Sequence, residues 1–168
     1  MKFSVTFVLC FFISSFANAS FDVSLEKRCS NNLEHVYYFS NLIIDADYSV
    51  KVGDSVYPYD VSFELVDNIY EADLVFVEKT FNSDRHVIEF SNNSDIQVCK
   101  KLTPSNATKI RLGNNLQDPD VTVKLSNYVL NRNYTLFVDS SRLSAKQVAA
   151  IYASIWNTDR ELFLSLLD

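Results

Sequence analysis

The sequence predicts a mainly β domain made of 13-residue strand–turn units and followed by two short C-terminal α-helices. The first observation is the spacing of Asp47, Asp60 and Asp73, which lie 13 residues apart and open similar segments. The second is the alternation of apolar and polar residues within these segments, which is typical of a strand with one buried face. The third is helical periodicity after residue 140. Self-similarity at a fixed spacing indicates a repeat architecture, and it outweighs any single motif.

Residues 1–19 have the pattern of a cleavable secretory signal peptide. One lysine precedes an apolar run, and the run ends in a small-x-small cleavage site at Ala19. The apolar run is too short for a stable membrane span, and no second long apolar run follows it. We therefore expect a mature protein that begins at Ser20, lacks a membrane span and is periplasmic or secreted. Residues 20–33 form an N-terminal segment ahead of the repeats.

Residues 34–140 form the predicted β-repeat domain. Its seven units begin at Glu34, Asp47, Asp60, Asp73, Ala107, Asp120 and Asn133. The fourth position of every unit is apolar, and the sixth is apolar except at Glu78. The eighth position is polar each time and is rich in Asn and Asp, which favour tight turns. Each unit is therefore expected to form a short strand, a polar turn, one more inward residue and a return.

The alternation also predicts which side chains are buried. In two units it places Phe63 and Val123 in the core, with Glu64 and Lys124 facing solvent. Residues 81–105 break the spacing, and we interpret 84–88 and 95–99 as two degenerate copies with shortened connections. Functional residues tend to lie where a regular pattern fails.

Residues 141–168 are expected to form a C-terminal helical cap. A capping box at Ser144 precedes apolar residues at helical spacing, and a second box at Thr158 precedes another apolar group. We expect Ile151 and Trp156 to pack on the β domain, because a repeat array needs protected ends. The alternative is that the first helix docks on a partner.

Two of the units resemble the repeat of the septoil-knot family, whose unit is Ala-Asp-x-x-Val-x-x-x-Asp-Ser-x-Tyr-x. The resemblance is carried by Ala46-Asp47-Tyr-Ser-Val-Lys-Val-Gly-Asp54-Ser55-Val-Tyr57 and by the segment from Asp67 to Val77. It is good over 45–77 and loose over 34–139. It implies a compact all-β domain of 13-residue units wound into a ring along a knotted path. A β-solenoid or an antiparallel meander fits the same pattern. The family offers no functional residues to carry over.

Composition narrows the possible partners. The chain has 15 basic and 21 acidic residues, a net charge of −6, and no cluster of Lys or Arg, so nucleic acid and anionic membranes are not expected partners. No catalytic, metal-binding or nucleotide-binding motif is present, and no cofactor is expected. The mature chain keeps Cys29 and Cys99, which we expect to form a disulfide in an oxidising compartment. The alternative is a reactive thiol.

The aspartate column admits two interpretations. Carboxylates stacked at Asp47, Asp60, Asp73 and Asp120 suggest calcium, which prefers hard oxygen ligands. Calcium-binding β-rolls need glycine-rich turns, however, and the chain has only two glycines. We therefore expect each Asp to accept hydrogen bonds from turn backbone N–H groups.

Two classes of function remain. The first is a non-enzymatic envelope or extracellular module, structural or binding, whose partner is an envelope protein or a polysaccharide. Its candidate binding residues are Tyr38, Tyr57 and Tyr59, because these tyrosines fall outside the inward positions. The second is an envelope hydrolase that uses His86 with the nearby carboxylates Asp84 and Glu89. A concave pocket shared by His86 and a carboxylate would favour the hydrolase.

Overall fold

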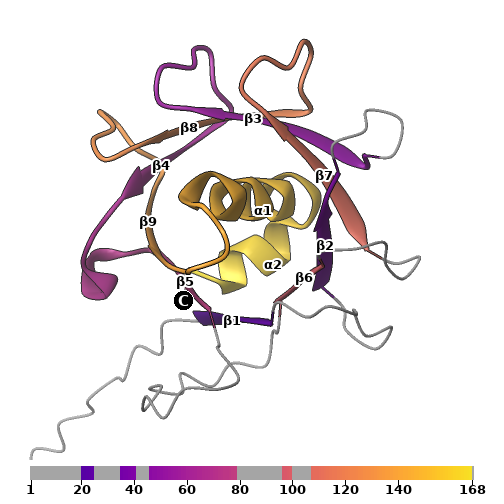
Figure 1. Cartoon of the computed structure of the whole chain (residues 1–168). Coiled ribbons are helices and arrows are strands. Elements are labelled where there is room, and N and C mark those ends of the chain that lie inside the picture. Colours follow the sequence, from indigo (N-terminus) through magenta and orange to yellow (C-terminus); the bar gives the residue numbers. More distant parts are fainter. Residues whose placement is uncertain (1–19, 25–34, 41–45, 79–95, 100–106, 168) are drawn as a thin grey trace, which may run out of the picture.

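The strands form one closed ring in which every pairing is parallel (Figure 1). The computed structural model describes residues 20–24, 35–40, 46–78, 96–99 and 107–167. The elements in chain order are β1 (Ser20–Ser24), β2 (His35–Phe39), β3 (Tyr48–Gly53), β4 (Val61–Leu65), the 3-10 turn η1 (Ile69–Glu71), β5 (Leu74–Glu78), β6 (Ile96–Cys99), β7 (Thr108–Gly113), β8 (Val121–Ser126), β9 (Tyr134–Asp139), α1 (Ala145–Thr158) and α2 (Arg160–Ser165). A mainly β fold with two short C-terminal helices is therefore confirmed.

Strands that are consecutive in the sequence are never neighbours in the ring. The order around the ring is β1-β5-β9-β4-β8-β3-β7-β2-β6, so each strand lies two places from the one before it. Because the number of described strands, nine, is odd, a chain that advances two places at each strand fills every position of the ring before it returns to the first. The alternative of an antiparallel meander is wrong, since all the pairs are parallel.

Strands β3 and β4 pair with their neighbours at the same two separations in sequence. In β3, Val50 pairs with Leu112 of β7 and Val121 of β8, which are 62 and 71 residues further along. In β4, Phe63 pairs with Leu125 and Tyr134 at the same two separations. The chain thus travels once around the ring and then lays its second set of strands between the first.

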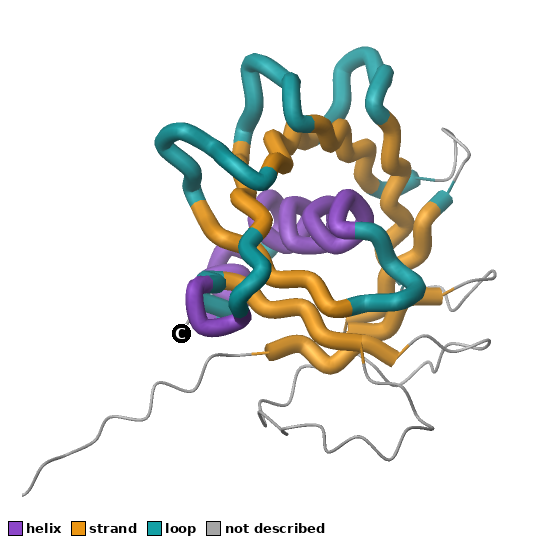
Figure 2. Tube along the Cα trace, turned by 60° about the vertical axis from the view of Figure 1, so that its left-hand side comes forward, coloured by secondary structure: helices purple, strands orange, loops and turns teal. Residues whose placement is uncertain are grey.

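The length of the connections suits this path. A strand of five or six residues is about 17–20 Å long, and two places around the ring correspond to about 10 Å. Seven or eight extended residues span roughly 25 Å at most. This length is just enough for the chain to return from the end of one strand to the start of the next strand in the sequence, which lies two places away in the ring. Figure 2 shows these loops standing outside the ring of strands.

The inward positions of the strands form the core. Phe63 and Val123 are fully buried as predicted, whereas Glu64 and Lys124 are only partly exposed. The fully buried strand residues at the fourth position of the units are Val50, Phe63, Phe76, Ile110, Val123 and Leu136. Alternation therefore assigned the buried face of these strands correctly.

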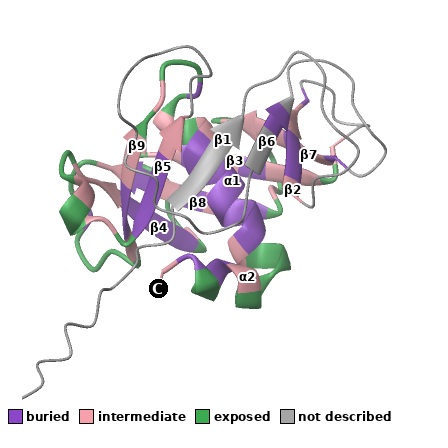
Figure 3. Cartoon of the chain, turned by 90° about the horizontal axis from the view of Figure 1, so that it is seen from below, coloured by how far each residue is buried: buried purple, intermediate pink, exposed green. Residues whose placement is uncertain are grey.

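Helix α1 lies inside the ring, surrounded by strands (Figures 1 and 3). Eight consecutive residues, Val148 to Ile155, are buried, so the helix is covered on all sides rather than along one apolar stripe. Small side chains at Ala149, Ala150 and Ala153 fit the faces that the large residues leave. The expected packing of Ile151 and Trp156 on the β core is confirmed.

The ring order explains why the chain turns inward after β9. The next step of two places leads to the position between β5 and β6, and β1 already occupies it. The chain therefore leaves the ring and runs back through the interior as α1. Helix α2 then lies at one end of the ring (Figure 3). There, Phe163 packs edge-on against the ring of Tyr134, with centroids 5.0 Å apart.

The helix caps agree in part with the sequence analysis. Ser144 forms the predicted capping box: its backbone N–H donates to Gln147 Oε1 at 2.9 Å, and its Oγ accepts from Gln147 N at 3.4 Å. The second box was assigned to the wrong residue. Asp159 is the N-cap of α2 and accepts from Leu162 N at 2.9 Å, while Thr158 ends α1.

Candidate binding surface

The regularly spaced aspartates join neighbouring strands. Asp60 Oδ2 accepts from Thr122 N at 2.7 Å, and Asp60 N donates to Thr122 O at 2.9 Å. Asp47 makes the same pair of bonds to Lys109. We call this contact between the first position of one unit and the third position of an adjacent unit a pin. The N–H donors, Lys109 and Thr122, belong to the neighbouring strands of the ring. The expectation that N–H groups of turns would provide the hydrogen bonds is therefore wrong.

Three further pins include a hydroxyl group. Asp73 Oδ2 accepts from both Thr135 N and Thr135 Oγ1 at 2.7 Å. Asp120 Oδ2 accepts from Ser49 N and Ser49 Oγ at 2.7 Å, and these bonds lower the pKa of Asp120. The remaining pin joins Asn133 Oδ1 to Ser62 N and Oγ. The five pins occupy the five successive interfaces from β5 through β9, β4, β8 and β3 to β7.

The interface between β7 and β2 is built differently. Ala107 stands at the first position of its unit, and Val36 stands at the third position of the opposing unit. Both side chains are buried and form a small apolar cluster, against which Tyr38 packs. The loss of the aspartate at Ala107 is therefore matched by the loss of a polar partner. The sequence contained this signal, because both positions change together.

The pins also bear on the calcium hypothesis. Each aspartate lies at a different strand interface and accepts hydrogen bonds from the adjacent strand. Within the described part of the chain, no three His, Cys, Asp or Glu side chains gather into a group that could hold a metal ion. The arrangement therefore supports a structural role for the column.

Glu78, the exception at the sixth position, holds the turn that leads into α1. Its side chain is only 3 % exposed, and its Oε1 lies 2.8 Å from Arg142 Nε. Its Oε2 accepts from Ser140 Oγ at 2.8 Å and from Ser141 N at 2.9 Å. A carboxylate at this site satisfies polar groups of the turn from β9 to α1, which an apolar residue would leave unpaired.

Two tyrosines inside the fold have strongly perturbed hydroxyl groups. Burial raises the pKa of Tyr152, whose hydroxyl donates to Val75 O at 2.8 Å. Burial, with a smaller contribution from Asp159, raises the pKa of Tyr37. Both side chains are buried and belong to the hydrophobic core.

The three tyrosines singled out from the sequence lie in different settings. Tyr57 is 90 % exposed in the loop after β3. Tyr59 is partly buried in the same loop, and Lys124 Nζ lies 5.5 Å from the centre of its ring. Tyr38 is partly buried on β2, which β7 separates from β3. Tyr57 and Tyr59 thus share the loop after β3, whereas Tyr38 lies on β2, two places away in the ring.

Sequence reasoning missed other exposed side chains on the neighbouring loops. Tyr70, 83 % exposed, lies in the loop after β4, and Tyr128 and Leu130, 74 % and 69 % exposed, lie in the loop after β8. We call Tyr57, Tyr70, Tyr128 and Leu130 the outer-loop surface. Strands β4, β8 and β3 are adjacent in the ring, so these three loops leave it side by side. The signal was present, since Tyr57 and Tyr70 occupy the same position of two units.

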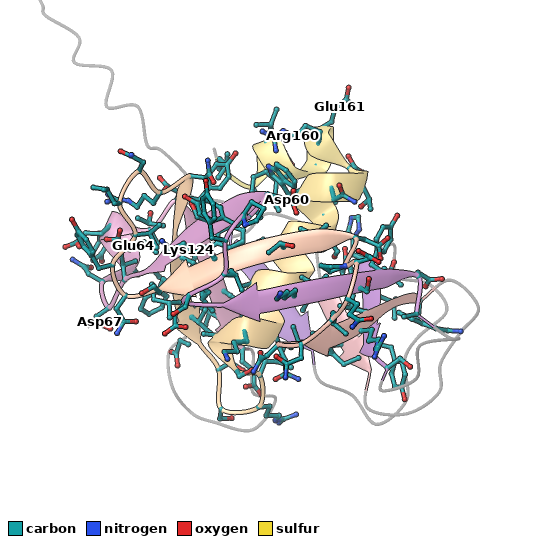
Figure 4. The ribbon with its side chains drawn as sticks, turned by 90° about the horizontal axis from the view of Figure 1, so that it is seen from above. Asp60, Glu64, Asp67, Lys124, Arg160 and Glu161 are labelled. Carbon is teal, nitrogen blue, oxygen red and sulfur yellow. The ribbon has the colours of Figure 1, made fainter. Side chains whose placement is uncertain are left out.

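The loop after β8 is anchored at its centre. Val129 is buried, and its N–H donates to Glu64 Oε2 at 3.1 Å. The same oxygen lies 3.4 Å from Arg132 in an ion pair. These contacts tie the loop to the end of β4 while Tyr128 and Leu130, on either side of Val129, remain exposed. Figure 4 shows Glu64 and Lys124 on this side of the molecule, away from Arg160 and Glu161 on α2.

A pocket of about 350 Å³ opens beside the outer-loop surface. It lies between the end of β3, the loop that follows it and the first turn of α1. Its lining residues are Lys51, Val52, Gly53, Asp54, Ser55, Val56, Tyr57, Asn114 and Lys146. Gly53 lets Val56 fold back here, because a Cβ at residue 53 would lie 3.1 Å from Val56 Cγ1. Tyr57 belongs to both the pocket and the outer-loop surface.

Several sequence predictions fall outside the described residues. His86, Asp84, Glu89 and Cys29 all lie there, so the hydrolase and disulfide hypotheses stay predictions. Of the two degenerate copies, 95–99 contains strand β6, whereas 84–88 lies outside the described residues. Neither α1 nor α2, the helices that the described ranges contain, combines the length and apolar character needed to cross a membrane.

No protein-family model matches the chain, and no curated protein or solved structure matches it significantly.

Proposed function

We propose that the mature protein is a non-enzymatic envelope or extracellular module that binds a polysaccharide through its outer-loop surface. The observation that carries this proposal is the exposure of Tyr57, Tyr70 and Tyr128 on three loops that leave adjacent strands. Large aromatic side chains this far into solvent contribute nothing to the core. Several of them on neighbouring loops are typical of a binding surface.

The chemistry of the loops favours a sugar over a protein. A tyrosine ring offers an apolar face for the C–H groups of a sugar ring and a hydroxyl at its edge. Asn127 and Asn131 lie close to Tyr128 in the sequence and are exposed, so amide donors and acceptors accompany the ring. A protein-binding surface has a continuous apolar centre, whereas here polar residues separate the apolar side chains.

The scaffold gives these loops a defined geometry. The pins fix the register of the strands from which the loops emerge, and Glu64 ties the loop after β8 to β4. Asn68 caps η1 by accepting from Tyr70 N at 3.1 Å, which orders the backbone that presents Tyr70. A preorganised surface loses less conformational freedom on binding.

The test is binding of mature protein, beginning at Ser20, to an array of polysaccharides, followed by titration of each ligand found. The variant carries Tyr57→Ala, Tyr70→Ala and Tyr128→Ala together. We expect at least tenfold weaker binding, because each stacked aromatic ring contributes about 0.5–1.5 kcal/mol. The fold should survive, since exposed substitutions usually change stability by less than about 0.5 kcal/mol.

The matched control is Leu164→Ala, which removes an exposed large apolar side chain from α2. It should bind as the parent protein does. If no polysaccharide binds and the tyrosine variant instead loses a co-purifying protein, the partner is a protein and the glycan proposal is wrong. Release of shortened products from a bound glycan would favour the hydrolase and contradict a non-enzymatic role.

We also propose that 34–140 consists of interchangeable 13-residue units of the septoil-knot type, wound along a knotted path and completed to a ring by β1. Support comes from the separations of 62 and 71 residues that recur at β3 and β4 and from the recurrence of the pins at the same positions. To test the repeat, the sequence of 120–132 replaces 60–72. The control inserts 121–133, which shifts every side chain to the opposite face. The first chimera should unfold cooperatively and the second should not; equal behaviour would refute equivalent units.

A further inference from the structure

The pocket beside Tyr57 gathers positive charge in an otherwise acidic protein. Lys51 of β3 and Lys146 of the first turn of α1 both line it, so the two lysines come from elements far apart in the sequence. Neither lysine forms an ion pair with a described residue. The whole chain carries a net charge of −6, which makes a local pair of cations on one pocket distinctive.

The end of α1 adds to the positive potential. The N-terminus of a helix carries a partial positive charge, which acidic residues in the first turn usually offset. The first turn of α1 has no acidic residue and contains Lys146. Ser144 and Gln147 satisfy the capping hydrogen bonds, so the terminus is ordered.

The remaining polar groups of the pocket are compatible with an oxyanion held by the two lysines. Asn114 lines the pocket and offers an amide donor. Among the described residues that line the pocket, the one acidic residue is Asp54, whose Oδ1 accepts from Ser55 Oγ at 3.1 Å. With two lysines against one carboxylate, the lining keeps a net positive charge.

We propose that this pocket binds an oxyanion carried by the polysaccharide, so that the ligand is an acidic glycan whose charged group lies between Lys51 and Lys146 while a sugar ring stacks on Tyr57. The inference rests on the proposed glycan binding and extends it to the class of sugar. Tyr57 lines the pocket and belongs to the outer-loop surface, which places the two contacts within reach of one oligosaccharide.

The test compares a uronic-acid hexasaccharide with its carboxyl-reduced, neutral counterpart, and then with sulfated and phosphorylated hexasaccharides. The parent protein should bind at least one acidic form about tenfold more tightly than the neutral form, with an affinity that falls as salt rises. Lys51→Gln and Lys146→Gln should each remove most of that preference while leaving the neutral form unaffected. The acidic form that binds most tightly identifies the oxyanion.

The matched control is Lys124→Gln, because Lys124 stacks on Tyr59 and does not line the pocket. It should keep the preference for the acidic form. Equal binding of acidic and neutral forms would overturn the anion site and leave the glycan proposal intact. Binding of neither form to the parent protein, with none to other glycans, would overturn both.

Discussion

Two parts of the ring solve the same packing problem with different chemistry. From β5 round to β7, five successive interfaces carry a pin between a carboxylate or amide and the adjacent strand. At the β7–β2 interface, Ala107 and Val36 make an apolar contact instead. At the β7–β2 interface, the first position of one unit and the third position of the opposing unit are therefore both apolar, whereas the pins have an Asp or Asn at the first position.

The two solutions differ in what they specify. A pin accepts N–H groups at defined positions, so a slip of one residue breaks it and leaves polar groups unpaired. An apolar contact has little directionality and tolerates small shifts. We infer that the pinned arc fixes the register of the ring, while the β7–β2 interface relies on its backbone pairing and on burial.

The largest effect is expected from placing a polar group on one side of the apolar interface. Ala107→Asp buries a carboxylate beside Val36 and should destabilise by about 3–5 kcal/mol. The double variant with Val36→Ser recreates the pair found at the pin of Asp120 and should recover about 1–3 kcal/mol. Urea unfolding of both variants measures the coupling. Additive effects would mean that the two positions do not form an equivalent of the pin.

A smaller effect is expected from breaking single pins. Asp73→Ala leaves the N–H of buried Thr135 without its acceptor, whereas the hydroxyl of Thr135 keeps Glu71 O at 2.9 Å, and the loss should cost about 1–3 kcal/mol. Asp47→Ala removes a single bond at an exposed pin and should cost about 0.5–1.5 kcal/mol. Equilibrium unfolding of the two variants gives the order. The reverse order would show that burial does not set the strength of a pin.

A pin that titrates can be separated from one that does not. Hydrogen bonds from Ser49 lower the pKa of Asp120, so this group stabilises the fold above its unfolded pKa of about 3.9, and the stabilisation is lost as pH falls through the folded value. The cost of Ser49→Ala should therefore be larger at pH 7 than in acid. Ser62→Ala is the matched control, because its partner Asn133 does not ionise. Its cost should not change with pH; equal pH dependence of both variants would contradict the assignment.

The smallest effect is expected on the outer face of the pinned arc. Lys124→Ala removes a partly exposed cation over Tyr59 and should cost under about 0.5 kcal/mol, measured by thermal or urea unfolding. A larger cost would mean that this side chain supports the loop after β3 rather than lying on the surface.

Local chemistry determined much of the fold. The alternation at Phe63 and Val123 identified the buried face, because the side chains of a strand alternate regardless of what the strand pairs with. The capping box at Ser144 was correct, because a cap satisfies the backbone of its own helix. The second box failed by one residue because Thr158 is already the last residue of α1.

The tertiary structure alone decided which strands meet. Strands that are consecutive in the sequence have another strand between them in the ring. No local pattern reveals a partner 62 or 71 residues away. The interior position of α1 follows from a full ring, since β1 already occupies the position between β5 and β6 that the strand after β9 would take. The pocket likewise joins Lys51 to Lys146 only through that interior helix. Sequence periodicity determines which face of an element is buried, whereas the closure of the ring determines what that face is buried against.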